Sequence, residues 1–83
     1  MSHKQHKEEP LLWFIAERIK ELRKEKDITQ EHFLFDTGIH IGRIERAGRN
    51  FSVSTLLVIC QYLDISLSDF FNTSKFTELN LTK

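Results

Sequence analysis

Apolar residues recur at helical spacing in the first third of the chain. At ~100° per residue they fall within about a 100° sector and define one buried helix face; the residues are Leu11, Leu12, Ile15, Ile19 and Leu22. Pro10 suits the first turn of such a helix, because its missing N–H is not needed there. The pattern predicts a helix over residues 10–26. The polar segment before it, residues 1–9, is expected to be a flexible tail.

A second helix is predicted immediately downstream. Thr29 can cap it with its side-chain oxygen, and Phe33 and Leu34 supply its buried face. The helix should stop by Gly38, because glycine readily takes the left-handed conformation at a helix end.

A third, shorter helix carries polar and basic residues. Ile41 and Ile44 lie three positions apart, which places one face of this helix in the core while His40 and Arg43 point elsewhere. Residues 47–50 are polar and are expected to form a loop.

The most apolar run of the chain follows that loop. Ser52 is a suitable N-cap for a helix whose apolar residues are Val53, Leu56, Leu57, Ile59, Cys60 and Leu63. Ser66 can cap a last short helix over residues 67–71. Beyond it, residues 76–81 alternate loosely between polar and apolar, which weakly favours a strand.

Two aromatic residues of the first helix lie off its buried stripe. Trp13 falls opposite the stripe and Phe14 falls to its side, where a lone surface helix would carry polar groups. Two explanations stay open at this point. Either the C-terminal tail covers Trp13, or these side chains belong to a subunit interface.

The composition fits one small domain. Eighty-three residues, 40% of them apolar and seven of them Phe, suffice for a single core without cross-links. Cys60 is the only cysteine, and its place in an apolar run indicates a buried residue in a reducing compartment. The chain lacks a signal-like N-terminus and any apolar stretch of ~20 residues, so we expect a cytoplasmic protein without membrane contact.

The charges balance overall but not locally. Twelve basic and twelve acidic residues give no bulk attraction for nucleic acid. From Gly42 to Asn50, however, three arginines (Arg43, Arg46, Arg49) stand against Glu45 alone. A local basic face of this kind can still bind a phosphate backbone.

Patterns typical of catalysis and metal binding are missing from the sequence. It contains no glycine-rich phosphate loop and no nucleophile with a partner base, so neither an enzyme nor a cofactor is expected. His3 and His6 lie three positions apart, but no further ligand set accompanies them, and no metal site is expected.

An ordered series of short motifs runs from about residue 12 to residue 71. It comprises Leu22-Arg23, Ile28-Thr29-Gln30-Glu31, Gly38, Arg43-Ile44-Glu45-Arg46, Arg49-Asn50, Ser52, Leu56-Leu57, Leu63 and Ser66-Leu67-Ser68-Asp69-Phe70-Phe71. The series resembles the XRE, or phage repressor and Cro-type, helix-turn-helix family. That resemblance implies an all-α, five-helix, lambda-repressor-like DNA-binding domain over residues 10–72, followed by a short C-terminal extension, residues 73–83.

The resemblance also implies a function. Members are sequence-specific DNA-binding transcriptional regulators, such as repressors, and bind a palindromic operator in double-stranded DNA as homodimers with helix 3 in the major groove. Gln30 corresponds to a phosphate or base contact, and Arg43 to a position that reads base edges. Arg23 and Glu45 match a structural ion pair between helices 1 and 3.

The candidate DNA-binding residues extend from the start of the second helix to the loop after the third. They are Thr29, Gln30, Thr37, Gly38, Ile39, His40, Arg43, Arg46, Arg49 and Asn50. The planar guanidinium of Arg43 can meet O6 and N7 of guanine together, a pairing worth ~1–3 kcal/mol of discrimination. The alternative is a solvated or phosphate-bound Arg43. Arg46, Arg49 and Asn50 would meet flanking phosphates.

This chain departs from the family in one spacing. The step from Gln30 to Glu45 is fifteen residues, almost one helical turn shorter than is usual in the family. If the second helix is shortened, Thr37 caps the third helix and Gly38, Ile39 and His40 occupy its front. If the third helix is shortened, Gly38 keeps a turn role and His40 becomes the cap. We favour the first arrangement, because threonine is the better N-cap.

Two further expectations concern partners. The C-terminal apolar residues exceed what a small monomer would leave near its end, which predicts a homodimer interface; these are Phe70, Phe71, Phe76, Leu79 and Leu81. The neutral net charge and the exposed aromatics also favour an alternative function. In that alternative the chain is an antitoxin-like module that binds a protein such as a toxin, and DNA binding is secondary or lost.

Overall fold

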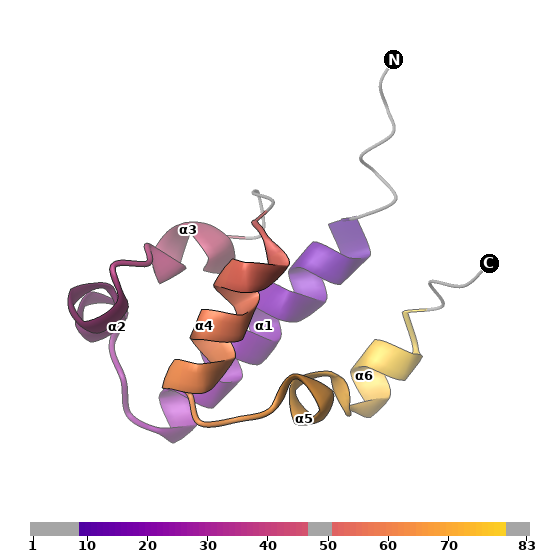
Figure 1. Ribbon diagram of the computed structural model, residues 1–83. Helices are drawn as coiled ribbons and strands as arrows, with labels where there is room; N and C mark the ends of the chain where they lie inside the picture. Colours follow the sequence, from indigo (N-terminus) through magenta and orange to yellow (C-terminus); the bar gives the residue numbers. More distant parts are fainter. Residues whose placement is uncertain (1–8, 47–50, 80–83) are drawn as a thin grey trace, which may run out of the picture.

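The computed structural model describes residues 9–46 and 51–79, and within them the chain is helical (Figure 1). The elements are α1 (Glu9–Glu25), α2 (Gln30–Thr37), α3 (Ile41–Glu45), α4 (Val53–Tyr62), α5 (Leu67–Phe71) and α6 (Ser74–Thr77). This arrangement confirms the predicted all-α class. None of the helices in this part of the chain is long and apolar enough to cross a membrane.

Hydroxyl caps start four of these helices. The side-chain oxygens of Thr29, Ser52 and Ser66 accept hydrogen bonds from the backbone N–H three residues on, each at 3.0 Å, as predicted. Thr73 does the same for Phe76 at 3.2 Å. This last cap explains why residues 74–77 form a helix where loose alternation favoured a strand, and that prediction is wrong for the described residues. Each such cap stabilises its helix by about 1 kcal/mol.

The core lies between α1 and the helices that surround it. The predicted stripe of α1 is buried at Ile15, Ile19 and Leu22, whereas Leu11 and Leu12 at its start are only partly covered. Other elements contribute fully or almost fully buried side chains, namely Phe33, Ile41, Ile59, Cys60, Leu63 and Phe70. Burial raises the pKa of the Cys60 thiol, as expected for a core residue.

The C-terminal aromatic residues pack on α1 of the same chain. The Phe14 ring lies 6.4 Å from the ring of Phe70, 5.9 Å from that of Phe71 and 5.4 Å from that of Phe76, measured between ring centroids. These contacts bury Phe14 and leave Trp13 54% exposed. The described part of the tail therefore covers Phe14 and leaves Trp13 half-exposed, so within these residues the explanation that the tail covers Trp13 is wrong.

This packing corrects part of the predicted dimer interface. Phe70 is fully buried inside the protomer and cannot reach a partner in this conformation. Phe71, Phe76 and Leu79 are partly covered by the same core. Leu81 lies outside the described residues. The apolar surplus near the C-terminus is thus used largely within the chain.

Arg18 fastens α5 to α1. Its Nε donates to the Phe70 carbonyl at 2.7 Å and its Nη2 to the Asp69 carbonyl at 3.0 Å. These carbonyls are at the C-terminal end of a helix, where a cation is favoured. The C-terminal part of the molecule is therefore held by polar as well as aromatic contacts.

Candidate nucleic-acid interface

The turn between α2 and α3 is built around Gly38. Gly38 has a left-handed backbone, with φ of 79°, and its N–H donates to the Leu34 carbonyl at 2.8 Å. The Thr37 hydroxyl donates to the Phe33 carbonyl at 2.7 Å and accepts from the Ile39 N–H at 3.0 Å. Thr37 is therefore the last residue of α2 and is bonded within the turn.

This turn shows which of the two helices, α2 or α3, is shortened relative to the family. The N-cap of α3 is His40, whose side chain makes no capping hydrogen bond. The favoured arrangement, with Thr37 as the cap, is wrong, and the shortening lies in α3. The physical reason is that glycine takes the left-handed position at a helix end without strain, so Gly38 ends α2 and outweighs threonine's advantage as an N-cap.

The short α3 divides its residues between core and surface. Ile41 and Ile44 are buried, as their spacing predicted. His40, Arg43 and Arg46 are exposed and follow one another at intervals of three residues, which puts them along one outward side of this single turn and a half. One imidazole and two guanidinium groups are therefore presented together.

A buried ion pair fixes α3 against α1. Arg23 Nε donates to Glu45 Oε2 at 2.8 Å, and Arg23 Nη2 donates to Glu45 Oε1 at 3.0 Å. Arg23 is 9% exposed and Glu45 is 5% exposed. The third nitrogen, Nη1, donates to the Ile28 carbonyl at 2.8 Å. The predicted pair is thus present in bidentate form, and it neutralises the one carboxylate of α3.

Gln30 joins this pair, which the sequence analysis did not anticipate. Its Nε2 donates to Glu45 Oε1 at 2.9 Å, so the amide of a predicted DNA contact helps to hold the end of α3. The approach is close because residue 42 is glycine. A Cβ built on Gly42 would lie 3.1 Å from Gln30 Oε1. A glycine inside so short a helix was the available signal, because it marks a close approach.

The outward side of α3 and the start of α2 form a shallow cleft of about 260 Å³. Its lining residues are Gln30, Glu31, Leu34, His40, Ile41, Gly42, Arg43 and Arg46. The structure therefore brings four of the candidate DNA-binding residues to one site. Glu31 is the one acidic group of this lining, against two arginines, so the cleft carries a local excess of positive charge.

The remaining candidates are placed differently. Thr29 is exposed, but its hydroxyl caps α2. Thr37 and Ile39 are half-buried in the turn, and Gly38 is exposed there. Arg49 and Asn50 lie outside the described residues.

The described residues contain no cluster of three or more His, Cys, Asp or Glu that could hold a metal ion. His3 and His6 lie outside the described ranges. The cleft itself presents imidazole and guanidinium groups, which can recognise a ligand by hydrogen bonds and charge.

Comparison with known proteins identifies the family. A family model described as a Cro/C1-type HTH DNA-binding domain matches residues 18–75, from the middle of α1 into α6. Searches of curated proteins and of solved structures found no match. The matched range contains the glycine turn, the outward Arg43 of α3 with Arg46 after it, and both members of the buried ion pair. This chain therefore belongs to the family of Cro/C1-type helix-turn-helix DNA-binding domains.

Proposed function

We propose that this protein is a sequence-specific transcriptional regulator that binds a palindromic operator as a homodimer, with α3 in the major groove. One observation carries the proposal. The buried pair of Arg23 and Glu45 orients α3 so that its isoleucines enter the core and its cations face outward. A major groove of ~12 Å admits one helix, and base edges there distinguish all four base pairs.

Arg43 on α3 and Arg46, the C-cap residue directly after it, have different tasks in this proposal. Arg43 is exposed and lines the cleft between α2 and α3, and it reads bases. Arg46 lies at the C-terminal end of α3, on the same outward side as Arg43, and it contacts the phosphate backbone. Arg49 and Asn50 remain predicted phosphate contacts, and His40 is a further donor at the front of α3.

The test compares single substitutions on a selected operator and on random DNA. Arg43→Ala should cost ~1–3 kcal/mol and relax the preference at one position of each half-site. Arg46→Ala should weaken all sequences alike and reduce the salt slope by about one. Lys75→Ala is the matched control, because this exposed cation lies on α6, away from the cleft, and its removal should change neither quantity.

Two results would reject this proposal. Selection from a random library could enrich no sequence above the input. Alternatively, Arg43→Ala could lose the same affinity on operator and random DNA, in which case Arg43 is a backbone contact and base reading by this residue is excluded.

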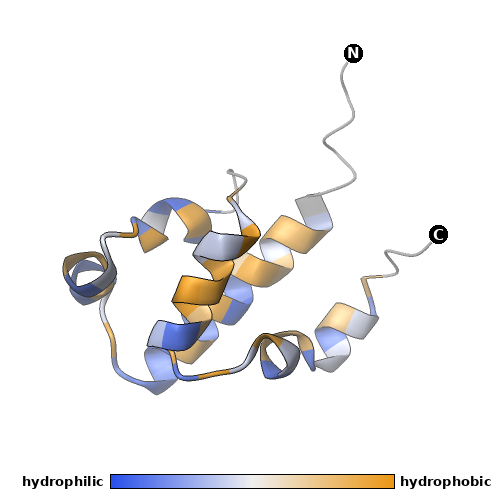
Figure 2. Cartoon of the chain, in the orientation of Figure 1, coloured by the Kyte–Doolittle hydropathy of each residue, from blue (hydrophilic) through white to orange (hydrophobic). Residues whose placement is uncertain are grey.

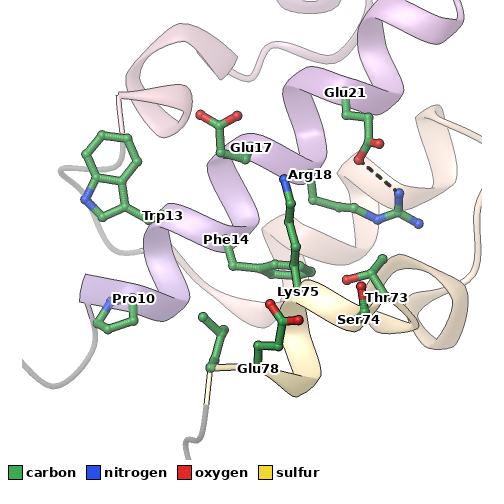
Figure 3. Close-up of a pocket in the computed structure, with 11 residues that line it drawn as sticks. Pro10, Trp13, Phe14, Glu17, Arg18, Glu21, Thr73, Ser74, Lys75 and Glu78 are labelled. Atoms are coloured by element: carbon green, nitrogen blue, oxygen red, sulfur yellow. Dashed lines mark hydrogen bonds and ion pairs between the residues drawn. The ribbon is translucent and has the colours of Figure 1, made fainter.

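A second candidate function, an antitoxin-like protein-binding module, is favoured by a groove between α1 and α6 (Figure 3). The groove has a volume of about 910 Å³, and Phe14 and the half-exposed Trp13 line it. Three carboxylates, those of Glu17, Glu21 and Glu78, and two cations, Arg18 and Lys75, also line it, and Glu21 is paired with Arg18 at 3.3 Å, so the groove keeps a small excess of negative charge. Aromatic groups beside carboxylates suit a partner segment that carries both apolar and basic side chains.

Trp13 is the only tryptophan of the chain, so its fluorescence reports occupation of this groove. Under the second candidate, an alternating Lys/Leu peptide should shift the emission of the wild-type protein. Glu78→Gln should weaken that response severalfold, whereas Glu25→Gln, a control outside the groove lining, should not. No spectral change with the peptide would reject this candidate.

A further inference from the structure

The outer face of α4 carries no charge. The helix reads VSTLLVICQY, ten residues without Lys, Arg, Asp or Glu, whereas eight of the seventeen residues of α1 are charged. Its inner side, which includes Leu56, Ile59 and Cys60, belongs to the core. Its outer side leaves Val53 74% exposed and both Leu57 and Val58 42% exposed. Figure 2 shows most of this helix coloured as hydrophobic.

These exposed side chains are neighbours. Val53 and Leu57 are four positions apart, so they lie one above the other on the helix, and Val58 adjoins Leu57. Ser54 and Gln61 complete the exposed arc with uncharged polar groups. A continuous apolar strip on a small soluble protein marks a contact surface.

We propose that the outer face of α4 is the self-association surface through which two copies of this chain form the DNA-binding dimer. The partner on this face is a second copy of the chain, because the exposed face of α4 has no charged side chain. A charged partner would meet no complementary group here and would lose its hydration. A second α4 brings no charge, and around a two-fold axis the same apolar strip meets itself.

The position of α4 in the fold supports the same occupant. The proposal rests on the proposed function, in which two copies of α3 read half-sites ~34 Å apart. Figure 1 places α2 and α3 at one end of the molecule, α5 and α6 at the other, and α4 between them. Because α4 lies nearer to α3 than α6 does, contact through α4 brings the two copies of α3 closer together than end-to-end contact through α6.

Leu57 occupies the middle of the strip. It lies four residues after Val53 and four before Gln61, so a two-fold axis through the centre of this face passes beside it. The two copies of Leu57 then pack against each other. Opposite charges introduced at this one position on two different copies should therefore attract.

The experiment measures self-association by sedimentation equilibrium, without DNA, on the full chain. The wild-type protein should dimerise, and Leu57→Glu and Leu57→Lys should each raise the dissociation constant at least tenfold. An equimolar mixture of the two variants should restore association, because each heterodimer pairs a carboxylate with an ammonium. Phe35→Glu is the matched control, since it charges an exposed aromatic on α2, which is 87% exposed, and should leave the constant unchanged.

Folding is checked in the same samples by circular dichroism. If either Leu57 variant is unfolded, Val53→Glu replaces it. This side chain is more exposed, and a carboxylate in the first turn of α4 is favoured by the helix dipole. It should weaken association in a folded protein.

Three results would overturn the inference: a wild-type chain that stays monomeric, folded variants that dimerise as tightly as wild type, or a mixture that does not associate. These outcomes are distinguishable from failure of the proposed function. A chain that selects DNA but does not associate through α4 overturns only the interface. A dimer disrupted by Leu57→Glu that enriches no DNA sequence supports the interface and overturns the DNA-reading proposal.

Discussion

Replacing Glu45 by Gln tests how the reading helix is held. Glu45 accepts two hydrogen bonds from Arg23 and one from Gln30. An amide has the same shape but supplies one acceptor oxygen, no charge, and an NH₂ group that faces other donors. The substitution therefore leaves the Arg23 guanidinium, which is 9% exposed, without its counterion.

The size of the effect follows from this burial. Removing one partner of a buried ion pair costs ~3–5 kcal/mol, because the other charge stays desolvated. Small domains unfold with ~5–15 kcal/mol in total, so the variant should lose a large share of its stability. For a domain of this size, ~3 kcal/mol corresponds to a fall in Tm of roughly 12–24 °C. Any folded fraction should still bind DNA, because Glu45 faces α1 and not the cleft.

Thermal melting and urea denaturation measure this loss, and a double-mutant cycle assigns it to the pair. Arg23→Met and Glu45→Met should each be strongly destabilising, but the double variant should cost less than their sum by ~2 kcal/mol, because it leaves no unpaired buried charge. A Glu45→Gln protein that melts within a few degrees of wild type would refute the reasoning, as would strict additivity in the cycle.

Three further outcomes are expected. Tyr62 is the only tyrosine, and the hydrogen bond from its hydroxyl to Asp36 raises its pKa above the ordinary value of 10.0. Its phenolate absorbance should therefore appear at higher pH than that of a model peptide. In Asp36→Asn the midpoint of this titration should move back toward 10.0. Because the folded pKa is raised, the stability that this bond contributes should be complete below pH 10.0 and decline as the pH rises through the higher folded pKa; no difference between the two proteins would contradict it. Gly42→Ala should change stability by less than about 1 kcal/mol, since the helix gain of alanine offsets the displaced Gln30 bond, but it should stabilise by about 1 kcal/mol when Gln30 is already alanine. Cys60 should react with a thiol reagent only through unfolding, so its modification rate in native buffer should follow the unfolding equilibrium measured by urea and should not match that of a free thiol.

The parts of the fold predictable from the sequence are those that depend on local chemistry. Thr29, Ser52 and Ser66 each bond to a backbone N–H three residues away, so the residue type and the start of an apolar run were enough to place the caps. The pairing of Ile41 with Ile44 followed from helical spacing alone. The Arg23–Glu45 pair spans twenty-two residues and was expected only through the family resemblance.

The predictions that proved wrong or incomplete depend on competition between two elements or on contacts between residues far apart in the sequence. Thr37 and Gly38 both carry valid signals, and the choice between them depends on which backbone conformation the turn adopts, which residue preferences alone do not decide. The Gln30 amide bonds to Glu45 across fifteen residues, and its position depends on the missing side chain of Gly42. Phe70 was assigned to a partner because its distance from Phe14 is visible only in the folded chain.

The shortness of α3 limits how much sequence information one protomer can collect. From His40 to Arg46 the helix rises ~9 Å at ~1.5 Å per residue. That length matches about three base pairs at ~3.4 Å each, so the two protomers of the proposed dimer would contact about six. A six-pair word recurs by chance about once in 4,000 base pairs, too often to mark a single genomic address. The palindromic operator proposed for this protein must therefore carry additional discrimination in the spacing of its half-sites and in the deformability of the DNA between them.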